Sequence, residues 1–292
     1  MMNQIILGLS TGATYSLVAI GLVMMYKVSG VMNFAYANMG MFVTYLIWWL
    51  ATGAGVNLYV SIAIGIAFAA VMGVVVERYG LRPIRHLSHA SMLIVTFGIL
   101  MILEGLAMQI WGTDYKAFPE LVTGAPYVFR GDFGIFVLRR QDILIFSILI
   151  AVSIALLIFT RYTKFGIAVR AVSENEETAG YMGINVGSVL AFSWGFGASM
   201  AAVVGIVAAP KVFVSPTMLT YYQIQGFAAA VLGGFETFTG AVFGGLILGV
   251  IEKLVGNYIS EGFKATISLV IIIIVLIFFP KGLFGRNVRG RV

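Results

Sequence analysis

Cysteine is absent from this 292-residue chain, and histidine occurs only twice. Without thiols the chain forms neither a disulfide framework nor a thiolate metal site, and His86 and His89, both in one basic loop, are too few for a metal centre. The phosphate-binding pattern G-x-x-x-x-G-K-[ST] and the metalloprotease pattern H-E-x-x-H are also missing. We therefore expect no enzyme and no resident cofactor.

Charge is scarce as well: only 10% of the residues are charged, whereas 60% are hydrophobic. Soluble domains are about 25% charged and about 45–50% apolar. A soluble fold with this composition would lack the polar surface to face water, so lipid must solvate much of the chain. In such a protein the net charge of +6 reflects membrane topology and does not indicate nucleic-acid binding.

Long apolar runs predict a single all-α domain over 1–292, a polytopic transmembrane helical bundle. A spanning helix takes about 20 residues, which leaves room for roughly eight or nine membrane segments. The run 270–277 is continuously apolar, whereas a transmembrane β-barrel would alternate apolar and polar positions. The runs are 4–26, 31–51, 57–76, 90–111, 142–160, 189–209, 223–234, 240–258 and 265–279.

The region 223–258 interrupts this regular pattern. Its first run is short for a span and ends at Gly233 and Gly234. It is either a broken, re-entrant pair of helices, which membranes tolerate only inside protein or along a water-filled path, or a short tilted helix with a tight glycine turn.

Lysine and arginine set the expected orientation, because both concentrate in cytoplasmic loops. We place the basic loops 77–89 and 161–188 and the C-terminal tail in the cytoplasm. The span count then puts the connection 112–141 and the N-terminus outside. The basic residues of the tail are Lys281, Arg286, Arg289 and Arg291.

Small residues recur at every fourth position within several runs. Such stripes let helices approach closely, either within the chain or with a partner, and the alternative interpretation is a glycine-lined pore. The stripes are Gly8, Gly12 and Ser16; Gly197, Ala201, Gly205 and Ala209; Gly240 and Gly244; and Gly245 and Gly249.

Glu104 lies inside the fourth run, where an ionisable side chain is a candidate pathway or proton-relay residue. The alternative is a hydrogen-bonded carboxylate near the outer interface. The expected translocation path comprises Asn33, Tyr36, Asn38, Glu104, Gly233 and Gly234.

The loop 161–188 predicts a short cytoplasmic helix. Ser173 followed by Glu176 forms a capping box, acidic residues occupy the first turn, and Gly183 stands where a helix ends. The helix is either a connector or a docking element with an apolar end. Its candidate residues are Ser173, Glu174, Glu176, Glu177, Tyr181, Met182 and Gly183.

The segment RAVSENEETAGYMGIN at 170–185 resembles the cytoplasmic coupling loop of ATP-binding cassette importer permeases of the branched-chain amino acid type, the LivH-like family. The segments 21–35, 233–245 and 279–285 are also similar to that family. The resemblance implies one of two permease subunits in the inner membrane, completed by two cytoplasmic ATPase subunits that bind ATP and an extracytoplasmic substrate-binding protein. The loop helix would then couple to the ATPases.

One departure bears on the solute. Members of this family commonly follow Asn-Phe-Ala with His-Gly-Glu, whereas this chain has Tyr36, Ala37 and Asn38. The resemblance therefore implies transport of branched-chain amino acids or a related small polar organic solute. Two alternatives remain: a passive channel or facilitator for a solute such as urea or an amide, and a secondary transporter.

Overall fold

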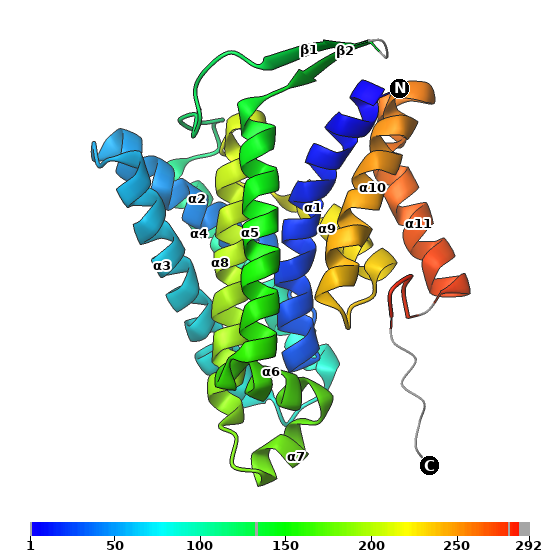
Figure 1. Ribbon diagram of the computed structural model, residues 1–292. Helices are drawn as coiled ribbons and strands as arrows, with labels where there is room; N and C mark the ends of the chain where they lie inside the picture. The colour runs from blue at the N-terminus through cyan, green and yellow to red at the C-terminus, as the bar shows by residue number, and fades with distance from the viewer. Residues whose placement is uncertain (1, 132–133, 280, 286–292) are drawn as a thin grey trace. The chain divides into compact units, whose positions relative to one another are not determined.

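The computed structural model describes residues 2–131, 134–279 and 281–285 (Figure 1). The α-helices of this part are α1 (Met2–Ser29), α2 (Tyr36–Trp48), α3 (Leu58–Val75), α4 (His89–Trp111), α5 (Arg140–Tyr162), α6 (Lys164–Glu174), α7 (Glu176–Tyr181), α8 (Val186–Val212), α9 (Thr220–Gly233), α10 (Phe238–Tyr258) and α11 (Lys264–Phe278). Short π or 3₁₀ segments extend α2 (Trp49–Gly53) and α3 (Val76–Leu81, then Arg82–Ile84) and precede α11 (Glu261–Phe263).

Seven helices in the described residues are long and apolar enough to cross a membrane: α1, α3 with its extension, α4, α5, α8, α10 and α11 with the turn before it. The helices α2 and α9 are shorter, with 13 and 14 residues. At about 1.5 Å per residue, each covers roughly 20 Å of a hydrocarbon core about 30 Å thick. The predicted polytopic helical fold is confirmed, and 220–258 contains a short helix followed by one of spanning length.

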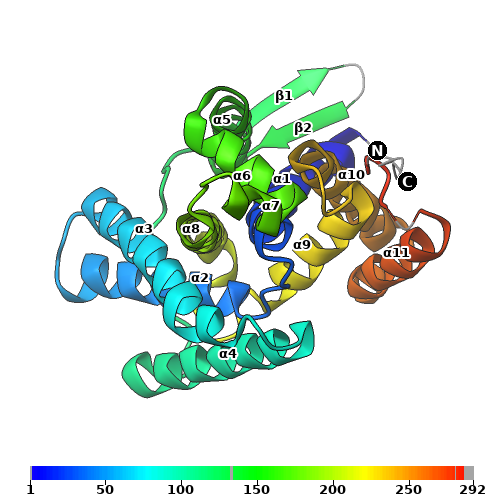
Figure 2. The ribbon, with the colours of Figure 1, turned by 90° about the horizontal axis from the view of Figure 1, so that it is seen from below.

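The chain divides into two compact units, of which the second comprises Met24–Leu121 and Ile154–Gln223. In this unit α8 packs against α2 and α3, and α2 also contacts α4 (Figure 2). Small residues make the contacts close: a Cβ added to Gly195 would lie 3.0 Å from the Ala70 carbonyl oxygen, and one at Gly205 would lie 3.1 Å from that of Gly40. The stripe on α8 therefore packs helices within the chain.

The first unit comprises Met1–Val23, Val122–Ser153 and Ile224–Val292. Here the glycines of α1 face those of α10, and a Cβ added to Gly12 would lie 2.6 Å from the Gly245 carbonyl oxygen. The Ser16 hydroxyl donates a hydrogen bond to the Val242 carbonyl at 2.7 Å. The packing interpretation of these stripes agrees with the structure.

The connection 112–141 contains a hairpin that the sequence analysis did not predict. Strands β1 (Tyr127–Gly131) and β2 (Gly134–Leu138) pair antiparallel, with Tyr127 opposite Leu138. Earlier in this connection, Lys116 exchanges two backbone hydrogen bonds with Val214, each 2.9 Å long. Of the basic tail only Lys281 lies within the described residues, because Arg286, Arg289 and Arg291 fall outside them.

Candidate translocation and coupling sites

The helical backbone is interrupted between α1 and α2, and the side chain of the predicted path residue Asn33 stabilises this interruption. Gly30 has a φ of +68°, a left-handed conformation that suits glycine after a helix end. The Asn33 side-chain oxygen accepts a hydrogen bond from the Ala35 N–H at 2.9 Å, while its amide nitrogen lies 3.4 Å from the Met25 sulfur. Asn33 is buried, and both polar atoms of its side chain are engaged in contacts within the local turn.

Gln223, at the beginning of α9, joins this break to a distant part of the chain. Its side-chain oxygen accepts from the Ala37 N–H at 2.7 Å, and its amide nitrogen donates to the Phe34 carbonyl at 2.9 Å. The Ala37 N–H lies in the first turn of α2, where N–H groups have no partner within the helix, and the Phe34 carbonyl lies just before this helix. The sequence analysis missed Gln223, whose only signal was a polar residue at the edge of an apolar run.

Asn38 and Glu104, two residues of the predicted path, meet between α2 and α4. The Asn38 amide donates to a carboxylate oxygen of Glu104 at 3.4 Å and to the Leu100 carbonyl at 3.5 Å. Asn38 is buried and Glu104 is half-buried. A carboxylate held by an amide donor inside a spanning helix can recognise a cationic or hydrogen-bonding group.

Other residues of α2 and α4 shape the surroundings of this pair. Thr96, which the sequence analysis also missed, accepts a hydrogen bond from the Phe34 N–H at 3.4 Å. The Phe34 and Phe97 rings stack with centroids 4.4 Å apart. The Tyr36 hydroxyl is buried and has no hydrogen-bond partner in the part of the chain described. Asn33, Tyr36, Asn38 and Glu104 thus belong to one neighbourhood.

Gly233 and Gly234 lie elsewhere, in the first unit, at the turn between α9 and α10. Gly234 has a φ of +97°, which side chains rarely adopt. The backbone of 281–285 runs along this turn: Leu283 N–H donates to Leu232 at 2.8 Å, and Phe284 N–H donates to Gly233 at 3.3 Å. The two glycines permit this close backbone approach.

The coupling loop contains two helices instead of the single predicted one, and the predicted capping box is wrong. Ser173 lies in the last turn of α6, where its hydroxyl donates to the Arg170 carbonyl at 2.8 Å. The cap of α7 is Asn175, whose side chain accepts from the Thr178 N–H at 2.8 Å. Asn175 has an extended backbone that separates α6 from α7, which sequence spacing alone did not reveal. The predicted stop is confirmed, since Gly183 has a φ of +84°.

The end of α7 presents apolar side chains to the surroundings. Tyr181 is 82% exposed and Met182 is 80% exposed. The Tyr181 hydroxyl donates to Glu177 at 2.8 Å, and Glu174 is exposed at the end of α6. The α7 end therefore combines an apolar tip with acidic residues.

Two arginines of the loop 77–89 reach the coupling loop and place both loops at the same end of the unit. Arg85 forms an ion pair with Glu176 of α7. Arg82 binds the buried Glu77 carboxylate with two nitrogens, at 2.7 and 3.1 Å, and also donates to the Gly187 carbonyl at 2.7 Å. The prediction that these loops share one side of the membrane agrees with this contact.

Comparison with known proteins identifies the family. Residues 4–280 match the sequence model of the branched-chain amino acid transport system / permease component. The chain belongs to this family. It is 32% identical to the high-affinity branched-chain amino acid transport system permease protein LivH of Escherichia coli K12, over 98% of this chain and 96% of that protein.

Further relatives in this permease family agree along nearly the whole chain. BraD of Pseudomonas aeruginosa, also a high-affinity branched-chain amino acid permease protein, is 29% identical over 98% of this chain and 96% of its own length. A probable branched-chain amino acid permease protein LivH of Methanocaldococcus jannaschii is 30% identical over 92% and 88%. The chain is thus a multi-pass transport permease that works with other transporter subunits. The prediction that it is not an enzyme is confirmed, since its relatives are transport permeases.

Proposed function

We propose that this permease is the membrane subunit of an ATP-binding cassette importer for branched-chain amino acids or a related small polar organic solute. A second permease subunit, two cytoplasmic ATPase subunits and an extracytoplasmic substrate-binding protein complete the importer in the inner membrane. The loops 77–89 and 161–188 and the C-terminus face the cytoplasm, and the N-terminus faces outside.

The exposed end of α7 carries this proposal. A capped helix with Tyr181 and Met182 projecting outward suits docking into a groove of another protein. The Arg85–Glu176 ion pair joins α7 to the connection between α3 and α4, so a displacement of α7 reaches the spans directly. ATP-driven closure of the ATPases then moves α7 and alternates access to the path.

The Asn38–Glu104 pair is the proposed solute contact of this permease. Both side chains lie on helices that meet within the membrane segment, and Glu104 contributes the negative charge that an ammonium group requires. Branched-chain amino acids are supported as the solute class because the relatives LivH and BraD are branched-chain amino acid permease proteins.

The test is reconstitution of the complete importer with Tyr181→Ala/Met182→Asp in the permease. Uptake driven by ATP should fall at least about tenfold, because an aromatic anchor is lost and a charge enters an apolar contact. The matched control is Tyr79→Ala, which removes a tyrosine that is 71% exposed outside α7.

The outcomes separate the proposed mechanism from its rivals. Solute flux without ATP and without any co-purifying ATPase would identify a passive channel. Uptake that collapses with an ionophore at constant ATP would identify a secondary transporter. Unchanged uptake by the double variant would refute docking through α7.

A further inference from the structure

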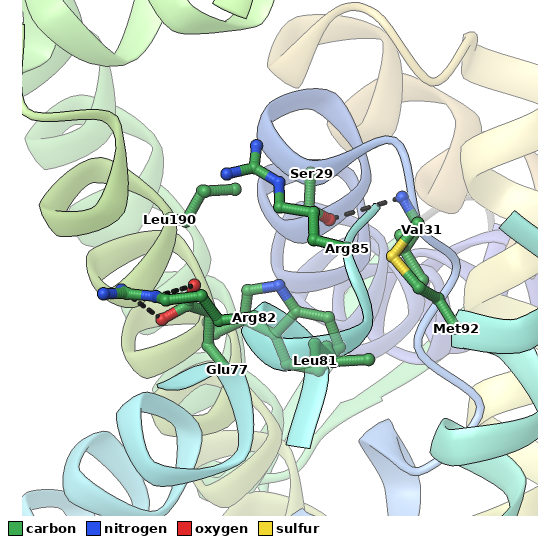
Figure 3. A pocket seen from close by; sticks show the side chains of 9 residues that line it. Ser29, Val31, Glu77, Leu81, Arg82, Arg85, Met92 and Leu190 are labelled. Atoms are coloured by element: carbon green, nitrogen blue, oxygen red, sulfur yellow. Dashed lines mark hydrogen bonds and ion pairs between the residues drawn. The ribbon is translucent and has the colours of Figure 1, made fainter. Parts of the chain in front are cut away.

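Arg82 links the end of α3 to the start of α8. Its guanidinium donates to both carboxylate oxygens of Glu77, at 2.7 and 3.1 Å (Figure 3). It also donates to the Gly187 carbonyl at 2.7 Å. Glu77 lies in the π segment that extends α3, and Gly187 is the second residue of α8. These three groups form a contact between two spanning helices, which we call the Arg82 clamp.

The Arg82 clamp is strong and closely surrounded. Glu77 is buried, and two-pronged bonds between arginine and a carboxylate are stronger and more directional than ordinary hydrogen bonds. The pocket beside the clamp, lined by Leu81 and Leu190 among others, has a volume of only about 20 Å³, room for about one water (Figure 3). The side chains of the clamp therefore have little space in which to change partners.

The helices α3 and α8 also pack closely along their length. A Cβ added to Gly73 would contact the Trp194 carbonyl, and one at Gly195 would lie 3.0 Å from the Ala70 carbonyl oxygen. Helices whose backbones approach so closely have dense contacts that transmit a displacement from one to the other. The clamp completes this packing at the helix ends.

Two connections from α7 reach the clamp. Arg85, which closely follows Arg82, forms the ion pair with Glu176 of α7. On the other side, a short turn joins the end of α7 at Tyr181 to α8, where Gly187 lies in the first turn. The Arg85–Glu176 pair is partly exposed, and exposed ion pairs contribute little. A displacement of α7 therefore acts mainly on the start of α8.

We propose that Arg82 is a positioning residue of the transport cycle, which makes α3 and α8 move together when α7 moves. This inference rests on the proposed function, in which the ATPases displace α7. Without the clamp, α8 would move while the end of α3 stays behind, because the Arg85–Glu176 pair is too weak to move it. The helix α2 carries Asn38 and packs against both α3 and α8, so their joint movement reaches the proposed path.

The experiment measures the solute taken up per ATP hydrolysed by the complete importer in proteoliposomes. The decisive variant is Glu77→Leu/Arg82→Met, because folds often tolerate apolar residues in place of a buried ion pair, whereas removal of one partner leaves a buried charge unpaired. Arg82→Lys keeps the charge and loses the planar fork of donors. The matched control, Arg78→Gln, removes an exposed arginine of the same π segment.

We expect the double variant to lower the uptake per ATP by at least about fivefold, while its rate of ATP hydrolysis stays within about twofold of the wild type. Arg82→Lys should lower this ratio by about twofold, and Arg78→Gln should leave it unchanged. A merely structural role would lower uptake and ATP hydrolysis together, because less importer would assemble.

A second measurement requires no transport. The chain has no cysteine, so Tyr79→Cys/Ser188→Cys places two spin labels at exposed positions beside the clamp. Electron–electron double resonance then gives the distribution of label distances in the full-length permease in nanodiscs. We expect a narrow distribution with the clamp intact, and one about twice as wide when Glu77→Leu/Arg82→Met is added.

Each result supports or overturns the positioning role. An unchanged uptake per ATP in the double variant, a parallel loss of uptake and ATP hydrolysis, or equally narrow label distances with and without the clamp would overturn it. A wild-type importer that transports with ATP while the double variant stays fully coupled refutes this inference alone. Absence of ATP-driven uptake by the wild type refutes the proposed function and this inference with it.

Discussion

The Gln223 side-chain oxygen accepts a hydrogen bond from the Ala37 N–H at 2.7 Å, across 186 positions of sequence. This bond, together with the one from Gln223 to the Phe34 carbonyl, fixes the first turn of α2. The start of α9 therefore determines where the proposed path residue Asn38 lies.

Replacing Gln223 with alanine should lower the free energy of unfolding by about 1–3 kcal/mol, because it removes the hydrogen bonds from this side chain to the buried Ala37 N–H and to the Phe34 carbonyl. Thermal unfolding of the purified permease measures this change. The control is Gln109→Ala on α4, where the side chain is exposed and should contribute little. A Gln223→Ala variant as stable as the wild type would contradict the assigned role.

Gly12→Ala should destabilise the permease by about 1–3 kcal/mol, since the added Cβ would lie 2.6 Å from the Gly245 carbonyl oxygen. Gly98→Ala in α4 is the matched control. A Cβ at Gly98 meets nothing within 4 Å, so alanine should be neutral or stabilising by up to about 1 kcal/mol. Comparable losses at both positions, measured by unfolding in one detergent, would refute close packing of α1 on α10.

Asn175→Ala should weaken α7 by about 0.5–2 kcal/mol, because the helix loses its cap, and ATP-driven uptake should fall with it. Asn175→Asp keeps a capping oxygen and should retain most of the activity. Ser173→Ala should leave both the stability of α7 and the uptake unchanged, since the Ser173 hydroxyl donates its hydrogen bond to the Arg170 carbonyl within α6. The reverse order of effects, with Ser173→Ala impaired and Asn175→Ala normal, would restore the capping box that the structure contradicts.

Glu104→Gln should reduce uptake by at least about tenfold if the carboxylate contacts the solute, because the replacement keeps the shape and removes the charge. The measurement is initial uptake rate against solute concentration in proteoliposomes. Glu120→Gln, an exposed acid in the connection 112–141, should leave uptake unchanged. Normal uptake by Glu104→Gln would remove this residue from the proposed path.

The sequence predicts most of the fold because lipid imposes a simple rule: apolar runs of spanning length must be helices. The close packing at Gly12 and Gly205 also follows from spacing, since small residues every fourth position form a flat face. Apolar runs and small-residue spacing predict these features because each pattern lies within one helix.

The sequence does not predict features that depend on contacts between distant segments. Gln223 caps α2 from another part of the chain, and Asp142, an acid in the first turn of α5, is buried where it accepts from Ser10 at 2.6 Å. Two candidate N-cap residues of α7, Ser173 and Asn175, lie close together in the sequence. The extended backbone of Asn175 shows that this residue is the cap. The pairing of Asn38 with Glu104 required the packing of α2 on α4.

The backbone hydrogen bonds from 281–285 to the turn between α9 and α10 also have a consequence for biogenesis. Residues 281–285 follow α9, α10 and α11 in the sequence, so they are synthesised after all three helices. The turn at Gly233 and Gly234 can therefore acquire these contacts only after α11 has been made. The hairpin of α9 and α10 is completed later than its own two helices.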